Sequence, residues 1–153
     1  MFDYLKYLLF YVVAAVAVVG IFAGGMWMPL SFAAILGYYM IGDAILGDDT
    51  STPKYRFPGL LTFQLWMTLP ILSVLVFAMV WSVSPTDFEG VGQWIQSVTG
   101  YDVLAARDAT TWAQRTGGIA LTGLMIAVMG TLVGHELTHR TWDPISMFFG
   151  RWN

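Results

Sequence analysis

The sequence predicts an all-α integral membrane protein, with four transmembrane helices in a single domain over residues 1–153. Hydrophobic residues make up 57% of the chain and charged residues only 11%, whereas a typical soluble domain is about 25% charged. Three stretches contain no Asp, Glu, Lys or Arg: residues 7–42, 57–86 and 116–135. Each is at least as long as the roughly 20 residues that a membrane-spanning helix needs. We therefore expect the lipid bilayer to surround most of the surface of these helices.

The first stretch is long enough for two spans separated by a tight turn. Gly24 and Gly25, followed by Pro29, are the residues expected to break it. Pro70 lies inside the third span and predicts a kink, because proline lacks the backbone N–H that a helix interior requires. The four spans are expected at about residues 5–24, 28–47, 59–83 and 112–138.

The orientation is predicted from the basic residues, which concentrate on the cytoplasmic side of membrane proteins. With four spans, one side collects Lys6, Lys54, Arg56, Arg140 and Arg151, and the other side collects Arg107 and Arg115. Both termini are therefore expected in the cytoplasm, with the chain in the inner (plasma) membrane as a multi-pass protein. The net charge of −3 argues against nucleic acid as a partner, and the absence of cysteine excludes disulfides and thiolate metal sites.

The loop before the fourth span is expected to contain a short amphipathic helix lying on the membrane surface. Five apolar residues recur there at helical spacing: Phe88, Val91, Trp94, Ile95 and Val98. Thr86 and Glu89 are expected to form a capping box at its start. After the fourth span, Pro144 disfavours helix at the residue before it. We therefore expect the helix that contains this span to end near Thr141 and the following apolar segment to run along the membrane surface.

The fourth span ends in the string Gly-His-Glu-Leu-Thr-His-Arg, which contains the two histidines of the chain, His135 and His139. Residues four apart lie on one helix face, so the two imidazoles can chelate one metal ion. Glu136 is rotated roughly 100° around the helix and could support a metal ligand or act as a general base. Asp43, at the end of the second span, could accept a hydrogen bond from a ligating imidazole, or could simply be an interfacial carboxylate.

Three interpretations of this pair compete. The pair could bind no metal, in a non-catalytic helical membrane protein that packs with partners. It could belong to a membrane zinc metalloprotease, since H-E-x-x-H on a helix is the signature of that class, although a third ligand is then needed. It could be part of a histidine-rich non-haem di-iron site, which is the interpretation we favour.

The segment His135–Arg140 resembles the first histidine box of the membrane fatty acid desaturase-like superfamily, in particular its alkane and xylene monooxygenase branch. The segment Gly42–Asp49 and the order of spans before the box are similar to the same branch. The resemblance implies a non-haem di-iron monooxygenase that hydroxylates an apolar substrate, an alkane or an alkyl-aromatic, with O2. It also implies iron as the cofactor, His135 and His139 as iron ligands, and rubredoxin or a ferredoxin-type protein as the electron donor.

Enzymes of this branch use further histidine boxes that are absent from residues 1–153. We therefore expect the chain to be the N-terminal part of a longer enzyme, inactive by itself, with a truncated product as the alternative. Large side chains within the spans could line a hydrocarbon channel, but we expect packing for any single one. These residues are Trp27, Trp66, Met67 and Met125.

Overall fold

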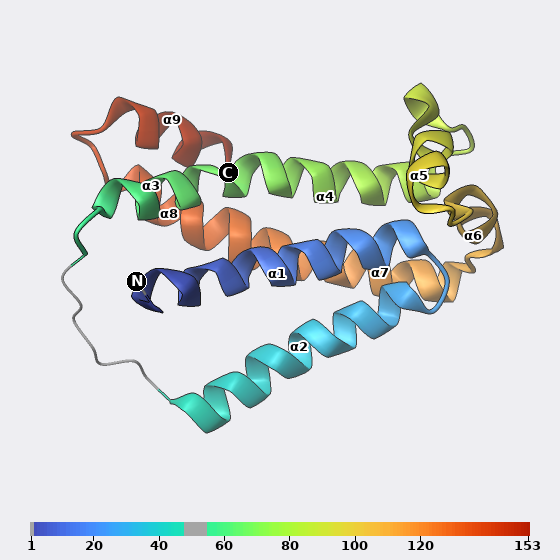
Figure 1. Cartoon of the computed structure of the whole chain (residues 1–153), viewed down its shortest axis with the longest axis horizontal. Coiled ribbons are helices and arrows are strands. Elements are labelled where there is room, and N and C mark those ends of the chain that lie inside the picture. Colours follow the sequence, from blue (N-terminus) through green and yellow to red (C-terminus); the bar gives the residue numbers. More distant parts are fainter. Residues whose placement is uncertain (1, 48–54) are drawn as a thin grey trace.

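The computed structural model describes residues 2–47 and 55–153, and over these residues the chain is helical, with no strand. The predicted loop residues Asp48, Asp49 and Lys54 lie outside the described residues. In chain order the elements are α1 (Phe2–Ala23), α2 (Trp27–Leu46), α3 (Pro58–Trp66), α4 (Thr68–Val83), the 3₁₀ turn η1 (Phe88–Gly90), α5 (Val91–Thr99), α6 (Val103–Ala109), α7 (Trp112–Met125), the π-helical η2 (Ile126–Thr131), α8 (Leu132–Thr138) and α9 (Pro144–Trp152). The long helices run side by side along the molecule, while α5 and α6 sit at one end of it (Figure 1).

Three helical segments in the described part of the chain are long and apolar enough to cross a membrane. They are Trp27–Ile45, Pro58–Val83 and Trp112–Thr138. The first helix contributes a shorter apolar segment, Tyr7–Ala23. The all-helical, membrane-compatible character of the chain is thus confirmed, while the crossing of the membrane by four spans stays a prediction.

The turn between α1 and α2 forms at the predicted glycines. Gly24 and Gly25 have φ angles of 67° and 52°, in the left-handed region that favours glycine. A side chain on Gly24 would also come within 2.8 Å of the Thr110 hydroxyl and 3.1 Å of the Ala106 carbonyl oxygen. The turn therefore needs glycine both for its backbone angles and for the close approach of α6.

The third predicted span is divided at Met67 into α3 and α4. Pro70 has no backbone N–H, so the carbonyl of Trp66, four residues earlier, loses its helical hydrogen bond. The break at Met67 lies next to this carbonyl. The predicted kink is therefore confirmed. The fourth span begins after a capping box formed by Thr111 and Gln114. Its π-helical stretch η2 has no counterpart in our sequence-based prediction.

The core lies where α1, α2, α4 and α7 meet. Small residues let these backbones approach closely, and Ala14, Ala17 and Ala78 are at most 2% exposed. Larger buried side chains fill the remaining space: Ile21, Met28, Leu75, Leu121, Met125 and Met129. Many apolar side chains point outward, among them Val12, Val19, Leu30, Val80 and Leu132. An apolar exterior around an apolar core is typical of helices surrounded by lipid.

The predicted capping box of Thr86 and Glu89 is wrong. Asp87 takes this role, and its carboxylate accepts hydrogen bonds from the backbone N–H of Gly92 at 2.8 Å and the indole N–H of Trp81 at 3.0 Å. Glu89 instead adopts a left-handed conformation with a φ angle of 53°. The preference arises because a charged acceptor can satisfy several donors at once. The short helix expected after this point is present as α5, followed by an unpredicted α6.

The predicted path of the last segment along the membrane surface is also wrong. The preceding helix ends at Thr138, three residues before the expected end at Thr141, and α9 then turns back along α8. Two glycines permit the contact: the backbone of Gly150 lies against Thr138, and its carbonyl approaches Gly134. This close backbone contact, rather than the apolar pattern, sets the direction of the segment.

Candidate metal-binding histidine pair and the adjoining cavity

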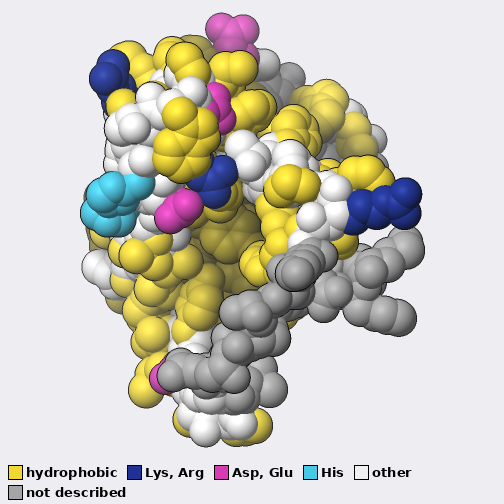
Figure 2. Space-filling view, turned by 90° about the vertical axis from the view of Figure 1, so that its left-hand side faces the viewer, with side chains coloured by type: hydrophobic (Ala, Val, Ile, Leu, Met, Phe, Trp, Pro, Cys, Tyr) yellow, Lys and Arg dark blue, Asp and Glu magenta, His cyan; other side chains and the backbone are white. Residues whose placement is uncertain are grey.

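His135 and His139 lie at the carboxyl end of α8, and both side chains are exposed. Their Nε2 atoms are 3.1 Å apart, and the two rings are nearly perpendicular, with an interplanar angle of 80°. Figure 2, which looks onto this end of the molecule, shows the histidines projecting from the edge of the surface. The structure thus brings the two predicted ligands together and presents them outward rather than into the bundle.

The separation of the two nitrogens fits a shared metal ion. With metal–nitrogen bonds of about 2.1 Å, two adjacent ligands at a right angle are about 3.0 Å apart, and in a tetrahedral site about 3.4 Å. The observed 3.1 Å lies between these values, and in the absence of metal it is the distance of a direct hydrogen bond between the two imidazoles. The carboxyl end of a helix carries partial negative charge, which further favours a cation there. The pair is therefore a suitable edge of a coordination sphere, and its geometry suits iron and zinc equally.

Glu136 lies on a different face of α8 from the pair, and its side chain is 58% exposed. Its carboxylate forms an ion pair with Arg140 at 3.1 Å, one helical turn later. The second guanidinium nitrogen of Arg140 donates a hydrogen bond to the hydroxyl of Thr62 at 2.9 Å, which ties α8 to α3. Glu136 is thus engaged with a cation on a different face of the helix from the imidazoles.

Asp43 lies in the last turn of α2, and its side chain is exposed. Figure 1 draws this end of α2 well apart from α8. Over residues 2–47 and 55–153, no group of three or more His, Cys, Asp or Glu side chains is arranged to hold a metal ion. A complete site would need donors beyond the two histidines, while the suggested hydrogen bond from a ligating imidazole to Asp43 stays a prediction.

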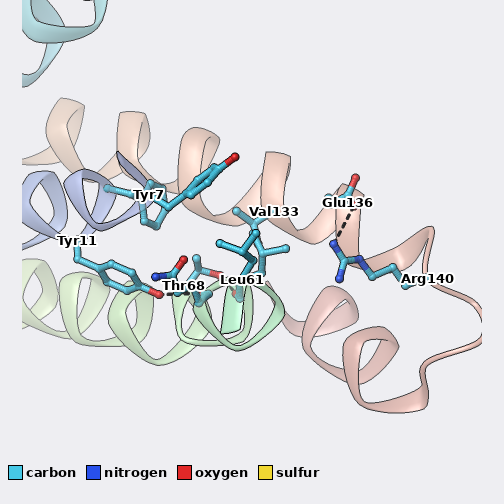
Figure 3. Close-up of a pocket in the computed structure, with 10 residues that line it drawn as sticks. Tyr7, Tyr11, Leu61, Thr68, Val133, Glu136 and Arg140 are labelled. Atoms are coloured by element: carbon cyan, nitrogen blue, oxygen red, sulfur yellow. Dashed lines mark hydrogen bonds and ion pairs between the residues drawn. The ribbon is translucent and has the colours of Figure 1, made fainter. Parts of the chain in front are cut away.

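A cavity of about 420 Å³ adjoins the inner face of α8. Figure 3 shows Tyr11 from α1, Leu61 from α3 and Val133 from α8 around it, with Glu136 and Arg140 at one end. Its walls are mainly apolar. The side-chain oxygen of Gln64 is buried at this cavity and has no hydrogen-bond partner among the described residues.

The four side chains that could have lined a channel do not line this cavity. Met125 is fully buried in the core, and the indole of Trp66 donates to Ser146 and stacks on Phe149. The cavity residue that sequence reasoning missed is Gln64. Its signal was available, because it is the one side-chain amide in the charge-free stretch 57–86, and polar groups within spans tend to have a function.

Comparisons with protein-family models, with curated proteins and with solved structures found no significant match to this chain.

Proposed function

We propose that this chain is the N-terminal membrane part of a non-haem di-iron monooxygenase of the alkane or xylene monooxygenase type. The observation that carries the proposal is the pair of exposed imidazoles at the end of a membrane-length helix, with Nε2 atoms 3.1 Å apart. In this proposal His135 and His139 supply two of the iron ligands. Because the chain has no other histidine, the remaining ligands come from polypeptide outside residues 1–153.

The proposal assigns different tasks to the two faces of α8. The outward face supplies the imidazoles, and the bound iron supplies the O2 chemistry of the complete enzyme. The inward face, with Val133 and the Glu136–Arg140 pair, borders the apolar cavity. An apolar substrate could thus lie within one helix diameter of the metal ligands, on the other side of the same helix. The electron donor in this proposal is rubredoxin or a ferredoxin-type protein.

The same proposal includes four spans and cytoplasmic termini. α1 contains 22 residues, which at 1.5 Å per residue is about 33 Å, close to the thickness of the hydrocarbon core. Its apolar segment packs mainly on α2 and α4, with further contacts to α7 and α6. Cytoplasmic termini would place the histidine pair where a soluble electron donor can reach it.

Metal binding by the purified chain in lipid nanodiscs tests the site. Isothermal titration with Co²⁺, as an oxygen-stable substitute for Fe²⁺, should detect one ion per chain. His135→Ala and His139→Ala should each weaken binding by tenfold or more, because a chelate becomes a single ligand. The matched control is Glu136→Gln on the same helical turn, which should leave the affinity within about twofold, since its partner is Arg140.

Two results would count against the proposal. If both histidine variants bind Co²⁺ as well as the wild type does, the pair is no metal site. If Glu136→Gln loses as much affinity as the histidine variants, Glu136 is itself a ligand and the assignment of the two histidines as the metal ligands of this chain is wrong. The DNA that follows the Asn153 codon supplies an independent test, because the proposal expects it to encode further histidine clusters.

A further inference from the structure

The two halves of the third predicted span, α3 and α4, are attached to the bundle in different ways. α4 buries side chains along much of its length, whereas none of the nine residues of α3, all of which the structure describes, is buried. The two helices meet at Met67, where Pro70 leaves the carbonyl of Trp66 without its helical hydrogen bond. A helix can bend at such a break. α3 is thus a short arm that a hinge joins to a firmly packed helix.

The hinge itself is held in place by contacts to α9. The indole of Trp66, the last residue of α3, donates a hydrogen bond to the hydroxyl of Ser146 at 3.0 Å. The hydroxyl of Thr68, the first residue of α4, accepts a hydrogen bond from the side-chain N–H of Asn153 at 2.7 Å. Because these contacts fix the hinge, a motion of α3 would be a rotation about it rather than a displacement of the whole segment.

Beyond the hinge, two hydrogen bonds cross from neighbouring helices to α3. The guanidinium of Arg140, which follows α8, donates to the hydroxyl of Thr62 at 2.9 Å. The hydroxyl of Tyr11, on α1, donates to the main-chain carbonyl of Gln64 at 2.6 Å. In a bilayer, the apolar side chains of α3 gain little from packing on other helices, because lipid tails are equally apolar. These two polar contacts therefore contribute strongly to holding α3 against the bundle.

The inner face of α3 forms one wall of the cavity of about 420 Å³ (Figure 3), where Leu61, Gln64 and Leu65 line it. On the opposite face of α3, the side chains of Leu60 and Phe63 are 48% and 53% exposed. A rotation of α3 away from the bundle would open the cavity sideways to the bilayer. It would also transfer apolar side chains into lipid rather than into water, so it carries no hydrophobic cost.

We propose that α3 is a hinged gate that opens and closes this cavity toward the lipid. Its hinge is at Met67, and its latch consists of the two hydrogen bonds that Thr62 and Gln64 accept. Both bonds are made in the closed state, which is the state of this structure. In the open state both are broken and α3 is turned outward. The gate needs no metal, so this inference stands independently of the proposed di-iron function.

Cysteine alkylation tests this inference, because the chain contains no cysteine of its own. The reporter is Val133→Cys, in the wall of the cavity on α8. The control reporter is Leu132→Cys on the same helix, where the native side chain is 65% exposed. With the full chain in nanodiscs without metal, N-ethylmaleimide should alkylate the Val133→Cys reporter at a rate that follows the population of the open gate. The rate at the control reporter should not depend on the gate.

Two variants weaken the latch with little change in side-chain shape, Thr62→Val and Tyr11→Phe. Each should raise the alkylation rate of the Val133→Cys reporter about fivefold, the factor that one neutral hydrogen bond provides. Together they should raise it about 25-fold, because the two bonds lie on different helices and act independently. The matched controls are Thr116→Val on α7, whose hydroxyl bonds within its own helix, and Tyr38→Phe on α2. Both should leave the rate within about twofold.

A distance measurement by electron spin resonance makes the test independent of thiol reactivity. With spin labels attached at Leu60→Cys on α3 and Leu132→Cys on α8, the wild type should give one main distance. The double latch variant should add a second, longer distance. The inference is overturned if the latch variants leave the alkylation of the Val133→Cys reporter unchanged, if they accelerate the Leu132→Cys reporter equally, or if the double variant keeps the single distance.

Discussion

The two ends of this molecule treat their polar groups in opposite ways. At the end with the α1–α2 turn, α5 and α6 (Figure 1), the chain supplies its own partners. The backbone N–H of Gly25 donates to the Thr110 hydroxyl at 2.7 Å, and the Tyr101 hydroxyl donates to the carbonyl of Ala23 at 2.9 Å. The buried guanidinium of Arg107 lies over the Trp81 ring, 5.0 Å from its centre, and donates to the carbonyl of Thr86.

At the opposite end, which carries His135 and His139 and is called the histidine end below, several side chains are exposed or lack a partner. Both imidazoles are exposed, Trp142 is 79% exposed, and the side-chain oxygen of Gln64 is buried without a partner in the described part of the chain. Most polar groups described at the first end thus stabilise a turn or a cap, although Nε of Arg115 is buried there without a hydrogen-bond partner among the described residues. The second end presents more exposed side chains, although its two imidazoles are within hydrogen-bond distance of each other at 3.1 Å. This contrast is the main structural argument for locating function at the histidine end.

The largest expected effect is at the end of the molecule that contains the α1–α2 turn, α5 and α6. Asp87→Ala removes the acceptor for Trp81 and Gly92 and should lower the free energy of unfolding by about 2 kcal/mol, at roughly 1 kcal/mol per hydrogen bond. Denaturation by sodium dodecyl sulfate in mixed micelles measures this change. Asp108→Ala is the matched control, because that side chain is 70% exposed and its ion pair should contribute at most about 0.5 kcal/mol. If the two variants lose equal amounts of unfolding free energy, Asp87 has no special role in stability.

A smaller effect is expected where α9 packs on α8. In Gly150→Ala the new methyl group would lie 2.9 Å from both the Cβ of Leu137 and the backbone nitrogen of Thr138. Such overpacking should destabilise the docked helix by about 1–2 kcal/mol, seen as faster hydrogen exchange in residues 144–152. Gly123→Ala meets no atom within 4 Å and should be neutral or slightly stabilising. Unchanged exchange in Gly150→Ala would show that α9 does not dock on α8 as described.

The smallest effect is a pH dependence of the α9 cap. The hydrogen bond from the Ser146 hydroxyl, with backbone N–H groups of Ser146 and Ile145, lowers the pKa of Asp143 from its ordinary value of 3.8. A lowered pKa adds stability above the unfolded value, and this contribution is lost as the pH falls below 3.8 through the folded value. Ser146→Ala should move the pKa back toward 3.8 in a carboxyl ¹³C titration, whereas Ser97→Ala, in α5, should leave it unchanged.

The sequence-based predictions were correct where short-range backbone preferences alone decided the structure. Gly24 and Gly25 formed the turn, and the helix with Pro70 is divided three residues upstream, at Met67. The membrane-length helical segment at the fourth predicted span runs from Trp112 to Thr138, within the predicted boundaries. The predictions failed where long-range contacts decided the result. Asp87 displaced the capping box because Trp81, on the preceding helix, supplied an additional donor. α9 left the expected surface path because glycines on two helices allowed close contact.

The sequence by itself determined the all-helical, apolar character of the chain and the spacing of His135 and His139, because both follow from composition and from the period of the helix. Only the tertiary structure decided which way each face of α8 points. The imidazoles lie on one exposed face, while Glu136 pairs with Arg140 on another face that borders the cavity. The physical reason is that the direction of a helix face depends on tertiary contacts, here the packing of α8 on α9 and the hydrogen bond from Arg140 to Thr62 of α3.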